Sequence, residues 1–149
     1  MGKRRFSINV FSDADNRILL LKRGFDTDIG PGLWGFCGGH IELGESPLQC
    51  AEREVREELG EHCHYRLIRE LGPVSDTWYG GRFEIWLFHW RWQGGDIRLN
   101  HEHTEYAWVS SDQYRGYAVV DGVDEDLAWL EVWPVIVLNH EKLPPRLKL

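Results

Sequence analysis

One stretch of twenty residues, 42–61, constrains the fold of this chain more than any other. It predicts a helix that begins after Ser46 with Pro47 in its first position, because serine caps free helix N–H groups and proline fits the first turn. Gly60 is placed to end it. Apolar residues recur inside the helix at spacings of three, four and four residues (Leu48, Ala51, Val55 and Leu59). The helix should therefore pack on a core with one face only.

The same stretch concentrates the negative charge of the protein. The 149 residues carry 17 basic and 24 acidic side chains, a net charge of −7, and residues 42–61 hold seven acids and two bases, or −5. Glu54, Glu57 and Glu58 lie on one helical face, where like charges repel by a few tenths of a kcal/mol per pair. A solvated helix face is the ordinary explanation for such a run. A divalent cation in a cleft would also explain it, since Mg²⁺ prefers carboxylate oxygens. Either way, we expect this face to point to solvent or into a cleft.

The spacing around the acidic residues is that of a known motif. Gly39, five residues, Glu45, seven residues and the run from Arg53 to Gly60 together resemble the Nudix box, which here spans 39–61. Two positions depart from the pattern: Glu61 replaces the last aliphatic residue, and Cys37 replaces a proline upstream. We expect neither departure to touch the acidic face.

The resemblance implies a fold and a reaction. The fold would be α/β, an α/β/α sandwich with a mixed β-sheet and a catalytic loop–helix–loop. The reaction would be Mg²⁺-dependent cleavage of a diphosphate linkage, with Mn²⁺ as a substitute. The implied metal ligands are three carboxylates and one backbone carbonyl (Glu54, Glu57, Glu58 and Gly38). Glu54 could instead activate water; Arg53 would orient the glutamates and pair with Glu45.

A further glutamate is expected from a loop. Many Nudix members take one six residues before a strand tryptophan, which with Trp108 as anchor points to Glu102 as ligand or base. Glu105 is the alternative. Three histidines lie near the site in sequence and are interpreted as structural (His40, His101 and His103).

Three residues are candidates for substrate binding. Arg23 could reach a phosphate, with a surface arginine as the equally plain alternative. Trp78 and Tyr79 could stack on a base, which is worth roughly 1–3 kcal/mol, or could pack in a core or dimer interface. Trp86, Trp90 and Trp92 share one strand face, and the sequence leaves open whether that face is core, interface or pocket wall.

The remaining pattern predicts one Nudix domain over residues 1–149. Strands are expected at 6–10, 18–21, 65–68, 83–90 and 105–109, the first two as a hairpin, with Gly-rich loop and short extended pieces at 24–39. A short helix is expected from Ser111-Asp112, a long one from Val123 to His140 with Pro134 kinking it, and a tail at 142–149.

Composition limits the function. The acidic balance excludes a general nucleic-acid binder, and no apolar run approaches the roughly 20 residues of a membrane helix. Three cysteines without pairing motifs predict a reducing compartment, so the cytoplasm is expected.

The expected substrate is a nucleoside triphosphate or another nucleoside-diphosphate derivative. The alternatives are a nucleotide sugar (GDP-mannose-like or ADP-ribose-like), a non-catalytic nucleotide-binding module, and an isomerase using Cys37 or Cys50. The many aromatic residues also allow a homodimer.

Overall fold

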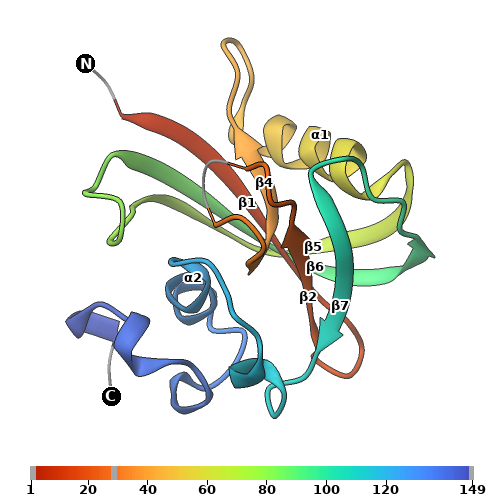
Figure 1. Cartoon of the computed structure of the whole chain (residues 1–149). Helices are drawn as coiled ribbons and strands as arrows, with labels where there is room; N and C mark the ends of the chain where they lie inside the picture. Colours follow the sequence, from red (N-terminus) through yellow and green to blue (C-terminus); the bar gives the residue numbers. More distant parts are fainter. Residues whose placement is uncertain (1–2, 28–29, 148–149) are drawn as a thin grey trace.

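The computed structural model describes residues 3–27 and 30–147, and within them the chain forms a mixed sheet flanked by two α-helices (Figure 1). The strands are β1 (Arg4–Ser12), β2 (Ile18–Arg23), β3 (Trp34–Gly35), β4 (Cys37–His40), β5 (His62–Ser75), β6 (Phe83–Asp96) and β7 (His103–Val109). The α-helices are α1 (Pro47–Leu59) and α2 (Val123–Leu130). Among the described residues, no helix combines the length and the apolar character that a membrane span requires.

The sheet divides around its central strand. The strand order is β3-β2-β1-β6-β5, and β1 runs parallel to β6 while its other pairings are antiparallel. On the opposite edge of β1, β4 pairs with residues 6–9 and β2 joins only at Ser12, opposite Ile18. β7 extends the β2 side. The expected hairpin of β1 and β2 therefore exists, but most of that edge of β1 is taken by β4.

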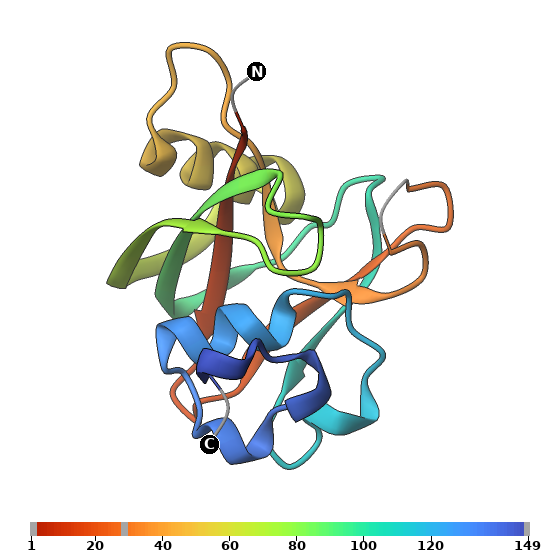
Figure 2. The same ribbon diagram turned by 90° about the vertical axis from the view of Figure 1, so that its left-hand side faces the viewer.

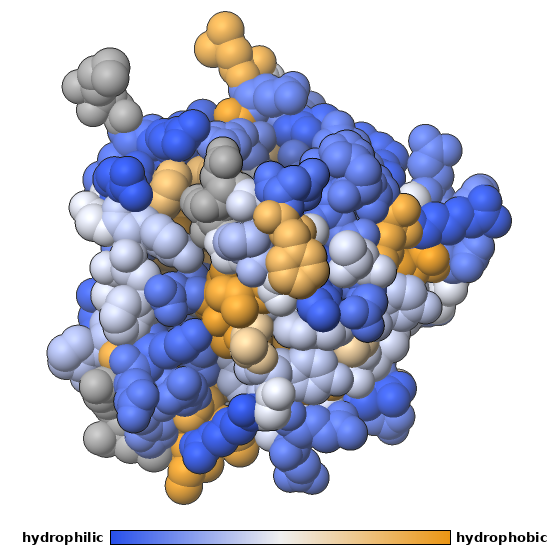
Figure 3. Space-filling model, viewed as in Figure 1, coloured by the Kyte–Doolittle hydropathy of each residue, from blue (hydrophilic) through white to orange (hydrophobic). Residues whose placement is uncertain are grey.

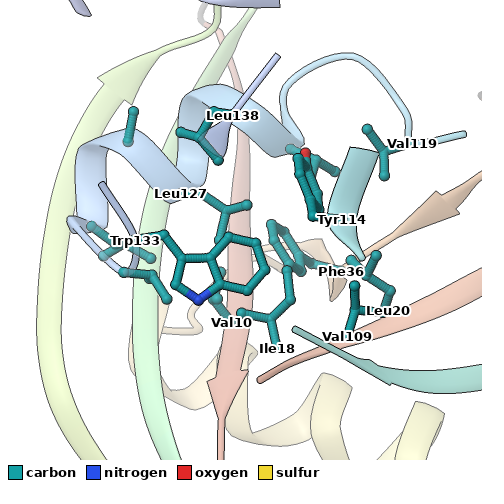
Figure 4. Packing of buried hydrophobic residues seen from close by; sticks show 14 of the residues in the cluster. Val10, Ile18, Leu20, Phe36, Val109, Tyr114, Val119, Leu127, Trp133 and Leu138 are labelled. Carbon is teal, nitrogen blue, oxygen red and sulfur yellow. The ribbon is translucent and has the colours of Figure 1, made fainter. Parts of the chain in front are cut away.

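The two helices cover opposite faces of the sheet (Figure 2). Alternate side chains of a strand point to opposite faces, so Val10 packs toward α2 and its neighbour Phe11 toward α1. Figure 4 shows the α2 side, where Leu127, Trp133 and Leu138 close over the sheet. The result is the predicted α/β/α sandwich.

The tryptophans of β6 belong to the other core. Trp90 is 5% exposed within the cluster on the α1 side, and Trp86 and Trp92 pack against that cluster. The face viewed in Figure 3 is mostly hydrophilic, with hydrophobic residues in small separate groups. Because all three tryptophans pack in or against this cluster, the strand face that they share belongs to the core.

Helix α1 forms as its sequence predicts. The Ser46 side chain accepts a hydrogen bond from the Gln49 backbone N–H at 3.1 Å, and the Gln49 side chain accepts one from the Ser46 N–H at 2.9 Å. This reciprocal pair satisfies two N–H groups that the first turn leaves free. Gly60, with φ +92°, ends the helix in a conformation that disfavours other residues.

The C-terminal part differs from the prediction. The helix expected over 123–140 ends at Leu130, because Glu131 adopts a left-handed conformation (φ +55°). Pro134 follows and cannot donate a helical hydrogen bond, so the chain continues in short 3-10 turns. The short helix expected at Ser111 is likewise a 3-10 turn, and it begins at Tyr114. The strands expected at 65–68 and 83–90 are parts of longer ones: 65–68 lies inside β5, and 83–90 is the first part of β6.

The expected tail, 142–149, is part of the fold as far as residue 147, and its last two residues lie outside the described chain. Leu143 is 2% exposed and packs in the core on the α2 side. We expect Leu143→Ala to lower the free energy of unfolding by about 2 kcal/mol, because a large buried side chain is replaced by a cavity. Leu43→Ala removes the same atoms from a fully exposed position and should have almost no effect. Urea denaturation of both variants tests this. Equal losses in the free energy of unfolding would mean that Leu143 lies in an exposed tail and not in the core.

A buried histidine makes stability depend on pH. His89 on β6 is 7% exposed, and its Nε2 lies 2.8 Å from the Ser12 hydroxyl. Burial, aided by the charge of Arg91, lowers the pKa of His89 to about 4. The unfolded chain therefore binds the proton more readily, so stability present above pH 6.5 is lost as pH falls toward 4.

The expected loss from His89 alone is about 2 kcal/mol between pH 7 and pH 5. We expect His89→Gln, which keeps a polar atom facing Ser12, to remove that part of the pH dependence. Urea denaturation of the parent and the variant at both pH values measures it. Parallel pH curves for the two proteins would contradict the prediction.

Candidate active site

Arg53 organises the start of the acidic helix. Its guanidinium donates two hydrogen bonds to the Glu45 carboxylate, at 2.7 and 3.0 Å, in a bidentate arrangement. It also donates to Glu54 at 2.9 Å, to Glu57 at 3.2 Å and to the His40 carbonyl at 3.0 Å. Hydrogen bonding from Arg53 lowers the pKa of Glu45 to about 2. The structure thus places Glu45 against Arg53 as the resemblance implies, and one cation holds three carboxylates in position.

The carboxylates of this helix do not share one environment. Glu57 is half exposed and held by Arg53, whereas Glu54 and Glu58 are 8% and 1% exposed. One oxygen of Glu58 accepts a hydrogen bond from the Gly38 N–H at 3.0 Å. The expectation that the whole acidic face points to solvent or a cleft is therefore wrong for Glu54 and Glu58, because α1 packs this face against β4.

The close packing of β4 needs two glycines. A Cβ atom at Gly39 would overlap the Glu54 carboxylate of α1, and one at Gly38 would overlap the Ser7 carbonyl of the neighbouring strand β1. Beside them, the Cys37 thiol donates to Glu58 at 3.5 Å. The expectation that the departure at Cys37 leaves the acidic face untouched is wrong for the same reason, since β4 carries Cys37 directly under α1. Glu61, the other departure, is exposed.

Burial changes the acidity of the two inner glutamates. Burial and then the neighbouring Glu54 raise the pKa of Glu58 well above its ordinary value. Burial also raises the pKa of Glu54, against the opposing charge of Arg53. Carboxyl groups so placed would bind a hard cation in exchange for their protons, and the oxygens at hand are of the kind that Mg²⁺ prefers. The donor set therefore fits a divalent cation.

The loop before β7 reaches the same place. Glu58, Glu102 and His103 offer ligand atoms that all lie within 4.8 Å of one another. The backbone of Glu102 is fixed on both sides, since its N–H donates to the Asn100 side chain and its carbonyl accepts from the Gly24 N–H, each at 3.0 Å. The structure thus brings Glu102 to Glu58, 44 positions away.

The other residues considered near this loop lie elsewhere. Glu105 forms an ion pair at 3.4 Å with Lys22 on the neighbouring strand β2, and His101 is exposed. His40 is exposed and lies against the Phe6 ring. His103, which the sequence suggests is structural, places its Nδ1 atom 3.5 Å from Glu58. Its position next to Glu102 at the start of a strand was the available signal. Burial and the charge of Arg23 lower the pKa of His103 to about 4.

A cavity of about 150 Å³ opens between the sheet and α2. Its walls are mostly apolar and aromatic, with Phe6, Ile85 and Trp129 among them, and Gly38 forms part of its lining. All three candidate substrate residues line it (Arg23, Trp78 and Tyr79). The indole N–H of Trp78 donates to the Lys142 carbonyl and the Tyr79 hydroxyl to the Asp121 carbonyl, each at 3.0 Å, which fixes both rings.

The cavity also has acidic residues, which sequence reasoning missed. Asp76 accepts hydrogen bonds from backbone N–H groups of its own turn, and Glu125 accepts one from Thr77 at 2.7 Å. Asp126 lines the cavity too, and burial raises its pKa well above the ordinary value. Only the packing of α2 over the sheet shows that Asp126 and Trp129 belong here, because the sequence places them in an ordinary amphipathic helix.

Comparisons with known proteins agree with this architecture. The model of the NUDIX domain matches residues 3–130. A curated relative, the nucleoside triphosphatase NudI of Escherichia coli O81 (strain ED1a), is 34% identical over 115 residues, which cover 69% of this chain and 79% of the relative.

Solved structures show the same fold. A Nudix hydrolase from M. Smegmatis, RenU, superposes with a TM-score of 0.68 at 18% identity, covering 88% of this chain and 84% of that one. The MutT protein from Methanosarcina mazei Go1 gives 0.62 at 21% identity, covering 82% and 87%. With the box, the buried glutamates and the sandwich in place, these matches show that the chain belongs to the Nudix family and is a pyrophosphohydrolase.

Proposed function

We propose that this enzyme hydrolyses nucleoside triphosphates in a reaction that depends on Mg²⁺, for which Mn²⁺ can substitute. One observation carries the proposal: Gly38 lines the cavity and its N–H also binds Glu58. A nucleoside in the apolar cavity would therefore extend its phosphates directly over the carboxylates of α1. The relative at 34% identity is named a nucleoside triphosphatase, which supports the same substrate class.

The residues around the cavity and on α1 have different roles in the proposed reaction. Trp78, Tyr79 and Trp129 offer aromatic surface to the base. Arg23 lines the cavity near His103 and supplies positive charge for a phosphate. Arg53 keeps Glu54 and Glu57 oriented, and Glu54 or Glu102 accepts a proton from the attacking water.

The divalent ion would be held by Glu54, Glu57, Glu58, Glu102 and the Gly38 carbonyl. When bound, it neutralises the diphosphate and lowers the pKa of water. The Gly38 N–H already fixes the Glu58 side chain, so Glu58 loses little conformational entropy when it binds the ion.

The isomerase and the passive binding module fit less well. Burial raises the pKa of the Cys37 thiol well above its ordinary value and that of Cys50 to about 11, so both thiols stay neutral and are poor nucleophiles. A passive binder would not need the carboxylates, and each one in the box is present. All three cysteines are free, which supports the proposed cytoplasmic location.

The deciding experiment is a substrate panel with Mg²⁺. We expect kcat/KM for at least one nucleoside triphosphate to exceed that for ADP-ribose-like and GDP-mannose-like nucleotide sugars by about tenfold or more, since the cavity is small, about 150 Å³. Mass spectrometry in ¹⁸O-labelled water identifies the phosphorus attacked. A preference for nucleotide sugars would overturn the triphosphate assignment, and a product without added water would overturn hydrolysis.

Arg23 gives a direct test of how the phosphates are bound. We expect Arg23→Gln to raise KM for the preferred triphosphate about tenfold and to change kcat less, because a ground-state charge contact is removed. Arg66→Gln is the matched control, an exposed arginine on the far edge strand β5. Equal KM values for the two variants would place Arg23 outside the phosphate site.

A further inference from the structure

One polar atom of the site has no explained partner. The Nδ1 atom of His103 is buried and makes no hydrogen bond within the part of the chain that the structure describes. The side chain is 4% exposed, so bulk solvent has little access to this atom. Nearly all buried polar atoms in proteins are paired, and an unpaired one calls for a ligand or a specific role. The nearest group is Glu58 Oε1, at 3.5 Å, which is too long for a good hydrogen bond.

The surroundings of that atom are those of a metal position. Glu58, Glu102 and His103 each present a ligand atom within 4.8 Å of the other two, from α1 and from the start of β7. Glu58 is held in place from behind, since its other oxygen accepts the Gly38 N–H. The unpaired nitrogen, Glu58 Oε1 and Glu102 thus lie close together.

The donor atoms select the kind of ion. Mg²⁺ favours oxygen ligands alone, whereas imidazole nitrogen suits Fe²⁺, Ni²⁺ and Zn²⁺, and Co²⁺ lies between Fe²⁺ and Ni²⁺ in the affinity order of first-row metals, with Mn²⁺ at its weak end. We propose that His103 joins Glu58 and Glu102 as a nitrogen ligand, which makes this a mixed nitrogen–oxygen position for a first-row transition-metal ion. The proposal rests on the proposed function in that Glu58 and Glu102 also serve its divalent cation, and it adds that the chain prefers transition metals over Mg²⁺ at this position.

Binding of the metals alone, without nucleotide, tests the proposal. Calorimetry with Co²⁺, Mn²⁺ and Mg²⁺ is compared for the parent protein, His103→Gln and the control His101→Gln, which changes an exposed histidine two positions away. We expect His103→Gln to weaken Co²⁺ at least about tenfold, Mn²⁺ by a smaller factor and Mg²⁺ less than about threefold, because a nitrogen ligand matters most to the metals that prefer it. His101→Gln should bind all three ions as the parent does.

Two results would overturn it. Equal weakening of all three ions would mean that His103 only positions Glu58, and unchanged binding would mean that it plays no part. If His103→Gln does not fold, pulsed electron paramagnetic resonance of Mn²⁺ in the parent protein decides, since a coordinated imidazole gives a ¹⁴N coupling and an all-oxygen site gives none. Hydrolysis with Mg²⁺ is measured separately. Absence of hydrolysis would contradict the proposed function, whereas unchanged metal binding in His103→Gln would contradict only the nitrogen ligand.

Discussion

Glu58→Gln is expected to lower kcat/KM about 1,000-fold or more, equivalent to about 4 kcal/mol of transition-state stabilisation. Glutamine has the same size and can still accept the Gly38 N–H, but it has no negative charge to offer a cation. Glu58 is 1% exposed, so no solvent or neighbouring flexible carboxylate can take over its position. Steady-state kinetics with the preferred nucleotide and saturating Mg²⁺ measure the effect.

The same variant should not destabilise the protein without metal. Burial raises the pKa of Glu58 well above its ordinary value, so the ionised side chain is costly in the metal-free fold. We expect the free energy of unfolding of metal-free Glu58→Gln to equal that of the parent or to exceed it by about 1 kcal/mol.

The matched control is Glu61→Gln, which removes an equal charge from an exposed position at the end of the same box. It should leave both activity and stability unchanged. Activity of Glu58→Gln within threefold of the parent would exclude Glu58 from the metal site. A fall in metal-free stability together with activity would mean that the loss comes from unfolding.

Arg53→Lys has the second largest expected effect, a loss of about 100-fold in kcat/KM. One lysine ammonium cannot reproduce the bidentate bond to Glu45 while also donating to Glu54, Glu57 and the His40 carbonyl. The carboxylates of α1 would keep their charges but lose their fixed orientation. Charge alone is retained, so the variant separates orientation from electrostatics.

The loss of Arg53 should also appear in the pH dependence of stability. The pKa of Glu45 is lowered to about 2 in the fold, so this pair contributes stability that is present above the ordinary pKa of 4.5 and is lost as pH falls toward 2. Arg53→Lys should therefore flatten the stability curve between about pH 5 and pH 3. Arg56→Lys, an exposed arginine on the same helix, is the control. If Arg53→Lys kept the activity of the parent and the same loss of stability at acid pH, the proposed role of Arg53 would be contradicted.

Where the determinants are local, sequence reasoning predicted the structure well. The cap at Ser46, the apolar stripe and Gly60 act within one or two helical turns, and α1 begins and ends where they indicate. The left-handed Glu131 has no comparable local signal, because most residues prefer to continue a helix there. Packing of the following segment against the sheet stops α2 at Leu130, and the same packing buries Leu143.

The site shows the same division. Its carboxylates could be named from the spacing of residues 39–61, because the helix sets their relative positions. Burial of Glu54 and Glu58 could not be foreseen, since it depends on the packing of α1 against β4, where Gly39 leaves room for the Glu54 carboxylate. The cavity also needs three segments that are far apart in the sequence, around Arg23, Trp78 and Asp126.

By itself, the sequence determined the acidic helix and the Nudix family, and it predicted the oxygen ligands of a divalent cation, because these depend on spacing along one helix and one loop. Tertiary structure alone decided which glutamates are buried, which aromatic side chains form the cavity and that His103 faces Glu58. The physical reason is that burial and proximity depend on contacts between distant segments, and a side chain acquires its pKa and its partners only when those segments meet.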